Sequence, residues 1–490
     1  MKNPDLIFKK HFEDPQNTGE LAITSASGKD SSLKSEILIV FNSFIEKNVI
    51  SDIRFKAFGC SYSIAASSMM TVLAKNKDIL EAAKITEDDI EKQLGVFPES
   101  KKDVLKVVLG AFRNMLTDYI SSHQKVRLHD EGAKRAAIAM SGGVDSSMAA
   151  KILKDRGWDI IGLTMRIVSP ELLEDHRLVT RSTSTDIESA YQVCRKLDIP
   201  HFVIDLTSQF EKKIIKPFCN DYLQGLTPNP CIECNKHIKF GLLLKNARML
   251  GACFMATGHY CRILKEEGQG TFEVHKGIDS SRDQSYVFWK LDQSQLSRIM
   301  TPLGDFTKEN IRKMSADLLP FLTSKDESQD ICFIFGQNYQ DFLGKRAPEI
   351  KEGKILNTDG DEIGTHSGYP YYTIGQRRGL GVSHTGPLYV IKIVPEDNII
   401  VAGEEKDLFG STAQLTNINF ISGKPPSSRF HAGVKIRYSS SEMPAEIKIT
   451  SPAEAIVAFE EKCSSVTPGQ SAVFYDDEVL LGGGIIKGQH

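Results

Sequence analysis

The chain has 490 residues, 41% of them hydrophobic and 25% charged, and a formal net charge of −3 at pH 7. These values indicate a soluble globular protein, and the length predicts about three domains. The near-neutral charge leaves any nucleic-acid site to a local basic patch. No apolar run reaches the ~18 residues of a membrane span, and the charged start has no apolar signal core. We therefore expect a cytoplasmic protein with no membrane partner.

The first 124 residues predict a small α+β domain. Strands are expected over 37–45 and 49–59, and helices over 64–76 and 103–120, from the spacing of their apolar residues. The polar stretch 125–134 then predicts a linker.

A different pattern covers residues 135–345. A short apolar strand over 136–140 is followed by a Gly/Ser turn and a helix over 146–157. Further strands over 160–165 and 200–206 alternate with helices, which predicts an α/β domain with a parallel sheet.

After about residue 346 short strands are broken by Gly, Asp and Asn turns. We expect a central β-rich domain over 346–407 and a small C-terminal β-barrel over 408–490. The predicted fold class is thus multidomain, with an α+β start, an α/β middle and a β-rich end.

The turn after the first α/β strand reads SGGVDSS, from Ser141 to Ser147. Gly142 and Gly143 let the backbone approach a ligand closely, and the amides at the helix start can bind phosphate oxygens. The Gly-Lys-Ser/Thr ending of a Walker A loop is missing, so the motif is instead a PP-loop for ATP. Asp145 is expected to help hold Mg²⁺. Such enzymes adenylate an oxygen and then exchange it for nitrogen or sulfur; a plain helix-capping turn is the alternative.

The cysteines of the chain bear on whether nitrogen or sulfur replaces the adenylated oxygen. Cys231 and Cys234 stand at a predicted helix start in NPCIECNKHIKFG, and Cys332 provides a third thiol. The helix dipole, Lys236 and Lys239 are expected to lower the thiol pKa values. A chance pair of buried cysteines is the alternative, but beside an ATP loop sulfur chemistry is favoured.

Many phrases after the linker, among them AMSGGVDSS, TPNPCIECNKHIKFG, ATGHY, DQSYVFW, KDESQDICFI and VTPGQSAVFYDDEVLLGGGII, resemble the tRNA-specific 2-thiouridylase family. The resemblance implies ATP-dependent thiolation of C2 of the wobble uridine in tRNAs of the lysine, glutamate and glutamine type. It also implies residue roles. The residues implied to contact ATP are Ala139, Met140, Ser141, Gly142, Gly143, Val144, Asp145, Ser146, Met165 and Gly258. Those implied to contact tRNA are Asn229, Pro230, Cys231, His259, Asp283, Gln284, Ser285, Arg437, Tyr438 and Gln470.

The resemblance further implies that Cys332 carries a persulfide and that Cys234 is the nucleophile that releases its sulfur, leaving a Cys234–Cys332 disulfide. Many members of the family have aspartate where this chain has Cys231. The three cysteines suit a [4Fe–4S] cluster whose open iron could hold a hydrosulfide, so a cluster and a bare thiol relay both stay open.

The first 124 residues resemble another family, the NifU/IscU-type iron–sulfur scaffolds, through HFEDPQNTGEL and IRFKAFGCSYSIAASSMMT. Of three expected cysteines only Cys60 remains. We expect Ser27 in SASGKD at the first position, and the last position falls near Lys101 and Lys102. We expect this domain to dock a cysteine desulfurase or other sulfur donor and to relay sulfur through Cys60. A remnant with an inert Cys60 is the alternative.

Two rival functions share some of these features. A PP-loop amidating ligase would need no thiol pair. A non-catalytic iron–sulfur scaffold would have a degenerate loop that binds no ATP.

Overall fold

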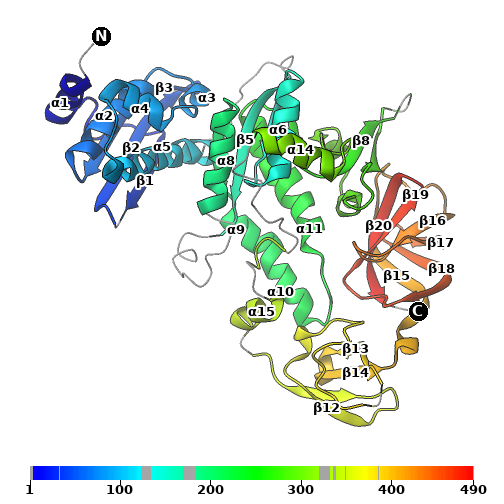
Figure 1. Cartoon of the computed structure of the whole chain (residues 1–490). Helices are drawn as coiled ribbons and strands as arrows, with labels where there is room; N and C mark the ends of the chain where they lie inside the picture. Colours follow the sequence, from blue (N-terminus) through cyan, green and yellow to red (C-terminus); the bar gives the residue numbers. More distant parts are fainter. Residues whose placement is uncertain are drawn as a thin grey trace.

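The computed structural model describes residues 4–32, 34–122, 134–168, 184–266, 268, 270–318, 331–334, 338–347, 349–384 and 386–488. Residues 125–133 of the predicted linker and residues 325–330 of the KDESQDICFI phrase lie outside the described residues. The N-terminal domain lies at one end of the molecule and the two β-rich parts at the other (Figure 1). The predicted multidomain fold class is confirmed: an α+β domain, an α/β domain with a parallel sheet, and a β-rich region with a closed barrel.

The N-terminal domain is a three-stranded antiparallel sheet with helices packed on it. Its strands are β1 (Ala26–Ser32), β2 (Ile37–Glu46) and β3 (Val49–Phe58). Its helices are α1 (Pro4–Glu13), α2 (Ser61–Ala74), α3 (Ile79–Ala82), α4 (Glu87–Leu94) and α5 (Lys102–Ser122). The four elements predicted here are confirmed to within a few residues.

The strand β1 escaped prediction because its sequence, ASGKDSS, is small and polar. Helix α5 lies directly across it: a Cβ on Gly28 would lie only 2.1 Å from the backbone nitrogen of Met115. Only glycine allows this approach, so tertiary packing rather than strand propensity fixes β1.

The prediction that Ser27 occupies a scaffold ligand position is wrong. Ser27 pairs with Asn42, whereas the Cys60 end of the sheet is marked by Ile37, against which Gly59 packs. At about 3.4 Å per residue Ile37 and Asn42 are roughly 17 Å apart along β2. Ligands of one cluster must converge, so a residue at the far end of the strand cannot join Cys60.

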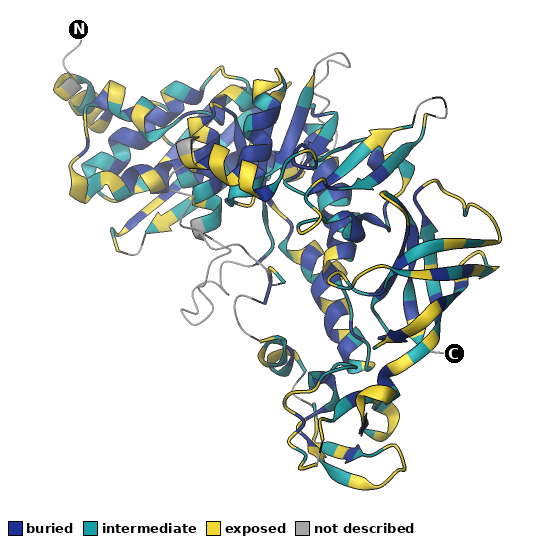
Figure 2. Cartoon of the chain, turned by 45° about the vertical axis from the view of Figure 1, so that its right-hand side comes forward, coloured by how far each residue is buried: buried dark blue, intermediate teal, exposed yellow. Residues whose placement is uncertain are grey.

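The second domain is built on a parallel sheet in the order β10-β7-β4-β5-β6. Its strands are β4 (Arg135–Ala139), β5 (Asp159–Arg166), β6 (His201–Asp205), β7 (Phe254–Ala256) and β10 (Ile299–Met300). The helices are α6 (Val144–Asp155), α8 (Ser184–Lys196), α9 (Thr207–Phe210), α10 (Lys216–Leu223), α11 (Pro230–Glu233), α12 (Leu244–Met249), α13 (Gln293–Leu296), α14 (Lys308–Leu318) and α15 (Tyr339–Arg346). The strands are buried and the outer helix faces exposed (Figure 2).

The rest of the chain forms two β structures. A four-stranded sheet in the order β12-β11-β14-β13 contains β11 (Gly353–Leu356), β12 (Glu362–His366), β13 (Tyr389–Val394) and β14 (Ile399–Gly403). The barrel contains β15 (Phe409–Phe420), β16 (Arg429–Lys435), β17 (Met443–Ser451), β18 (Glu454–Ser464), β19 (Ser471–Asp476) and β20 (Val479–Gly488). Pairing of β15 with β20 closes it.

A hairpin from the second domain extends the barrel sheet. Its strands β8 (Cys261–Lys265) and β9 (Phe272–Lys276) pair with each other, and β9 pairs with β20. The α/β domain and the barrel therefore share hydrogen-bonded backbone.

The N-terminal domain packs on the other side of the α/β domain, against α8 and β6. Arg195 on α8 pairs with Glu87 and Asp88 at the start of α4, and the guanidinium of Arg113 lies 3.4 Å from the ring centroid of Tyr191. One apolar core runs from the N-terminal sheet into the α/β sheet. Among the described residues no helix is long and apolar enough to cross a bilayer.

Candidate active site

The SGGVDSS turn lies between β4 and α6, as predicted. Gly142 has φ +71°, and α6 begins directly after Gly143, so its first amides stand free of side-chain caps. The hydroxyls of Ser146 and Ser147 donate to the carbonyl of Gly143 at 3.2 and 2.7 Å, which fixes the turn. The result is a set of backbone donors at a helix N-terminus, the arrangement that binds phosphate.

Gly258 of ATGHY packs directly on this loop. A Cβ there would lie 2.8 Å from the carbonyl carbon of Asp145 and 2.9 Å from the nitrogen of Ser146. The predicted ATP residues on β4, the loop, β5 and the end of β7 therefore converge at the carboxyl edge of the sheet. This is where parallel α/β sheets bind ligands.

Asp145 already has close partners in the protein. The ammonium of Lys308 lies 2.7 and 2.8 Å from its two carboxylate oxygens, and the hydroxyl of Tyr260 donates to one of them at 2.8 Å. Lys308 is only 7% exposed. The sequence analysis missed Lys308 and Tyr260 because they lie 163 and 115 positions from Asp145, with no spacing signal.

The thiol motif forms one irregular helix. The side chain of Asn229 caps α11 by accepting from the amide of Cys231 at 3.1 Å. From Cys234 to Leu243 the helix is π-helical before α12 continues it. Residues five apart lie about 140° apart around an α-helix, whereas the wider π turn, closed by i→i+5 hydrogen bonds, brings them closer to the same side. Lys239 is thus brought to the side of Cys234.

The three predicted thiols influence one another. The charge of Cys231 helps to raise the pKa of Cys234, and both cysteines help to raise that of Cys332, so the three thiols lie near one another. All nine cysteines are free thiols. Cys231 and Cys332 are exposed at the surface, whereas Cys234 is buried.

The predicted lowering of the thiol pKa values is wrong in sign. Burial raises the pKa of Cys231, raises that of Cys234 to about 11 and raises that of Cys332 to about 12. Although Cys231 and Cys332 reach solvent, protein surrounds their sulfur atoms closely enough to disfavour a thiolate. Lys239 opposes this effect at all three thiols.

His259 connects the thiols to the ATP loop. Its Nε2 accepts from the ammonium of Lys239 at 3.4 Å, and its Nδ1 then donates to the hydroxyl of Thr257 at 2.7 Å. Burial and Lys239 hold the pKa of His259 well below its usual value, so the ring is neutral. Its neighbour Gly258 touches the phosphate loop.

Several residues predicted to contact tRNA surround the same space from the barrel side. Tyr438 is 41% exposed. The pKa of its phenol is raised, mainly by partial burial and also by the charges of Asp283 and Cys231. The amide of Gln470 donates to the carbonyl of Thr227, just before the thiol motif, at 3.1 Å. Barrel and α/β domain thus meet at the thiols.

Other residues predicted to contact tRNA are buried or hydrogen-bonded within the protein. Ser285 is fully buried, and its hydroxyl bonds Asp283 and Tyr475 at 2.7 and 3.1 Å. One terminal nitrogen of Arg437 donates to the carbonyls of Ile374 and Ser465 and to the hydroxyl of Thr467. Pro230 is also buried.

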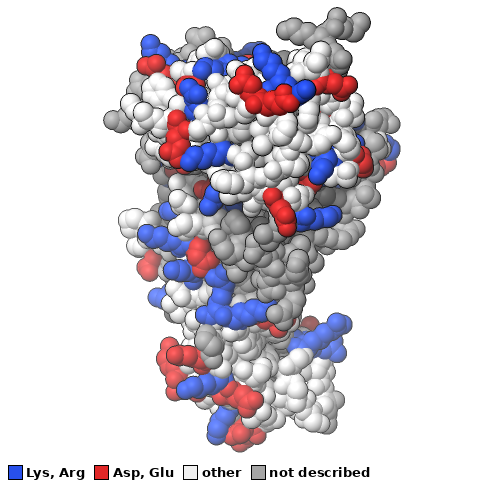
Figure 3. Space-filling model, turned by 90° about the vertical axis from the view of Figure 1, so that its left-hand side faces the viewer, with Lys and Arg blue, Asp and Glu red and all other residues white. Residues whose placement is uncertain are grey.

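Cys60 lies where predicted, at the junction of β3 and α2, and it is half-buried. The exposed side chains Leu38 and Phe58 pair across β2 and β3 beside it. On the face of the molecule seen in Figure 3, acidic and basic side chains are intermingled without a patch of one sign.

Comparison with known proteins adds four family matches. The N-terminal residues 6–126 match the NifU-like N terminal domain, and residues 134–336 match the tRNA methyl transferase HUP domain. Residues 340–404 match the tRNA methyl transferase PRC-barrel domain, and 411–486 match the aminomethyltransferase beta-barrel domain.

Curated relatives are more specific. The tRNA-specific 2-thiouridylase MnmA of Carboxydothermus hydrogenoformans is 40% identical over 358 residues, which is 73% of this chain and 98% of the relative. MnmA 2 of a Thermoanaerobacter species is 44% identical over 355 residues, 72% of this chain and 98% of the relative. The chain belongs to the tRNA-specific 2-thiouridylase family. The N-terminal NifU-like domain is added to this thiouridylase unit.

Among solved structures, a 4-thiouridine synthetase–RNA complex with bound ATP is 17% identical and covers 44% of this chain and 51% of its own, with a TM-score of 0.26. Within the described residues no group of three or more His, Cys, Asp or Glu side chains is arranged to hold a metal ion.

Proposed function

We propose that this protein is an ATP-dependent tRNA 2-thiouridylase that replaces O2 of the wobble uridine by sulfur in tRNAs of the lysine, glutamate and glutamine type. One observation carries the proposal: the adjacent residues Gly258 and His259 link the phosphate loop to the thiols. Gly258 packs on the loop at Asp145, and His259 bonds Lys239, which acts on all three thiols. An adenylated base held at the loop would therefore lie beside sulfur.

The first step makes oxygen a leaving group. The uracil O2 attacks the α-phosphorus of ATP, an O2–AMP bond forms, and pyrophosphate leaves into the loop amides. Lys308 adds a positive charge beside that loop through its contact with Asp145. Asp145 is the carboxylate beside the loop that would hold Mg²⁺, which prefers oxygen ligands. Lys308 and Tyr260 already contact its oxygens, so it would have to share or exchange these partners to bind the ion.

The second step delivers sulfur. The terminal sulfur of a persulfide on Cys332 attacks C2 and AMP leaves; Cys234 then attacks the bridging sulfur atom of Cys332, so the S–S bond to the base-bound sulfur breaks. The base keeps the sulfur, and a Cys234–Cys332 disulfide remains for a dithiol reductant. Lys239 stabilises the anionic sulfur that burial disfavours.

The third thiol, Cys231, allows a second source of sulfur, a hydrosulfide bound to an iron–sulfur cluster. Cys231, Cys234 and Cys332 are thiol donors of the type that iron–sulfur clusters need, and their mutual electrostatic influence supports a common site. Within the described residues the three thiols are not arranged to hold a single metal ion. A [4Fe–4S] cluster binds each cysteine through a different iron and so needs more widely spaced thiols, and these are the residues that would hold it. When bound, such a cluster supplies an open iron able to hold a hydrosulfide.

The N-terminal domain is proposed to receive sulfur or a cluster from a cysteine desulfurase or other donor. The exposed apolar pair Leu38 and Phe58 beside Cys60 supports a docking surface there, and Cys60 would be the thiol that relays sulfur.

The test is thiolation of a tRNA transcript with ATP and a persulfide donor, measuring AMP and the thiocarbonyl absorbance of the base. We expect both products from the wild type, none of the thiolated base from Cys234→Ser or Cys332→Ser, and normal turnover from the control Cys253→Ser. A wild type that forms neither AMP nor thiocarbonyl would refute the proposal. If a variant with Cys231, Cys234 and Cys332 all changed to serine kept an ammonia-dependent turnover, an amidating ligase would be favoured instead.

The cluster has its own test. Protein purified without oxygen is assayed for iron, sulfide and a visible absorption band, for the wild type and Cys231→Ser. If the wild-type protein is colourless and still thiolates tRNA from a persulfide donor, the cluster is refuted and the thiol relay is the mechanism that remains.

A further inference from the structure

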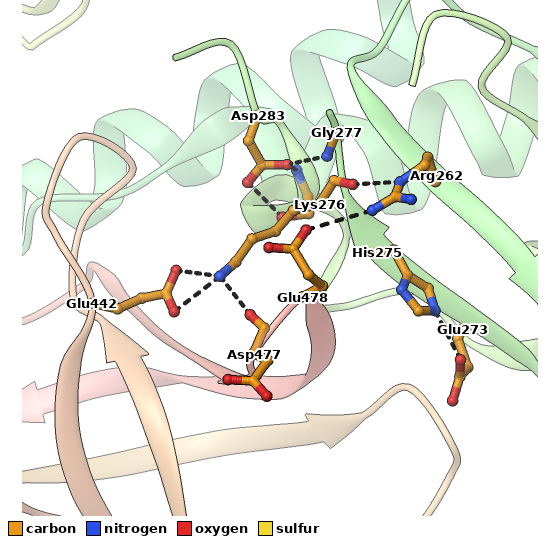
Figure 4. A network of polar contacts seen from close by, with 10 residues as sticks. Arg262, Glu273, His275, Lys276, Gly277, Asp283, Glu442, Asp477 and Glu478 are labelled. Carbon is orange, nitrogen blue, oxygen red and sulfur yellow. Dashed lines mark hydrogen bonds and ion pairs between the residues drawn. The ribbon is translucent and has the colours of Figure 1, made fainter. Parts of the chain in front are cut away.

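The hairpin β8–β9 ends in a lysine that ties two domains together. The ammonium of Lys276 lies 2.8 and 3.0 Å from the two carboxylate oxygens of Glu442 and donates to the carbonyl of Asp477 at 2.5 Å (Figure 4). It also lies 4.9 Å from the ring centroid of Tyr475. The Lys276 and Glu442 side chains are 19% and 30% exposed, so the ion pair is partly shielded from water.

The base of the hairpin is braced by further contacts. Arg262 donates to the carbonyl of Lys276 at 2.8 Å and pairs with Glu478 at 3.5 Å (Figure 4). Asp283 accepts from the amide of Gly277, next to Lys276, at 3.0 Å. Lys276 therefore projects from a rigid support.

Glu442 closes a loop that faces the thiols. The loop between β16 and β17 spans residues 436–442, and its first half carries Arg437 and Tyr438. Arg437 anchors it to the carbonyl of Ile374 in the central domain at 3.1 Å. The loop is thus held at one end by the central domain and at the other by Lys276.

Between these anchors Tyr438 is presented to the site. Its ring lies edge-on to that of Tyr286, with centroids 6.0 Å apart, and remains 41% exposed. Cys231 and Asp283 are close enough to act on its phenol. An exposed aromatic ring beside the reacting thiols is suited to stack on a base of single-stranded RNA.

The geometry points to the Lys276–Glu442 ion pair as a positioning device that holds Tyr438 against the substrate nucleotide. This inference rests on the proposed function. Because both oxygens of Glu442 and the carbonyl of Asp477 surround the Lys276 ammonium, Lys276 acts through the loop and does not serve as a phosphate ligand. Lys276 and Glu442 are positioning residues, and Tyr438 is the residue that touches tRNA.

A double-mutant cycle tests this coupling. We expect Lys276→Met and Glu442→Gln each to raise the KM for tRNA by about tenfold, with kcat and ATP affinity unchanged. Tyr438→Ala should raise the same KM, and adding Lys276→Met to Tyr438→Ala should change nothing further. The reversed pair Lys276→Glu with Glu442→Lys should restore part of the lost affinity.

Lys265→Met, on the exposed outer end of β8, is the matched control and should match the wild type. If the effects of Lys276→Met and Tyr438→Ala multiply, or if Glu442→Gln leaves KM unchanged, the positioning role is overturned. Glu442→Gln keeps the test valid if thermal melting shows that Lys276→Met does not fold. A wild type without thiolation would instead count against the proposed function.

Discussion

Lys308 holds both carboxylate oxygens of Asp145, at 2.7 and 2.8 Å, across 163 positions of sequence. The lysine is the first residue of α14, and Asp145 is in the first turn of α6, directly after the glycines of the phosphate loop. A nearly buried ammonium therefore stands where the phosphates of ATP are expected, and its charge balances that of the carboxylate.

Lys308→Met is expected to weaken ATP binding by about tenfold or more, because it leaves an unpaired carboxylate beside the phosphates. Titration calorimetry with ATP and Mg²⁺ measures this. Lys313→Met, at an exposed position of the same helix that pairs with Glu309, is the control. Unchanged ATP affinity in Lys308→Met would show that the ammonium serves only the fold.

Lys239→Met is expected to slow thiolation by about ten- to a hundredfold, since Lys239 is the cation that opposes burial at all three thiols. Lys239→Arg should retain more activity, and ATP binding should be unaffected in both variants.

A pH profile separates this effect from misfolding. In iron-free protein the alkylation rate of Cys234 should still rise with pH towards its pKa of about 11. Removal of Lys239 should move that profile to higher pH, because the charge that favours the thiolate is gone. Lys236→Met should leave the profile in place; an unmoved profile in Lys239→Met would contradict the assignment.

His201→Gln is expected to flatten the acid sensitivity of the fold. Burial and Arg113 of the N-terminal domain lower the pKa of His201 to about 3, against 6.5 when exposed. Below pH 6.5 the unfolded chain gains a proton that the folded chain refuses, so stability falls as pH falls from 6.5 towards 3. Between pH 7 and pH 5 the loss is about 2 kcal/mol for one such group.

Urea unfolding of the wild type and His201→Gln at pH 7 and pH 5 measures the difference. His275→Gln, on the β8–β9 hairpin and paired with Glu273, is the control. Equal acid sensitivity of the wild type and His201→Gln would rule the effect out.

Cys60→Ser is expected to slow thiolation when sulfur comes from a desulfurase and cysteine, but not when a small persulfide donor is used. The reason is that Cys60 lies in a separate domain from the three thiols and could act only before they are loaded. If Cys60→Ser thiolates tRNA at the wild-type rate with the desulfurase and cysteine, Cys60 relays no sulfur and the N-terminal domain only docks the desulfurase.

The sequence alone determined the main features of both fold and chemistry. Alternating and helical apolar spacing predicted β2, β3 and α5, because each buries one face. Helical spacing also predicted α2, although this helix is buried on nearly every side. The SGGVDSS turn predicted the phosphate loop since its conformation depends on adjacent residues. Cys231, Cys234 and Cys332 could be named as one thiol set from their motifs.

Only the tertiary structure decided the packing of β1, the thiol pKa values and the distant partners of the charged groups. The polar strand β1 exists because Gly28 allows α5 to lie on it, and Ser27 proved to be at the wrong end of that strand. The thiol pKa values rise because burial outweighs the helix dipole and Lys239. The partners Lys308 and Glu442 reach Asp145 and Lys276 from distant segments, and no local spacing encodes contacts of that kind.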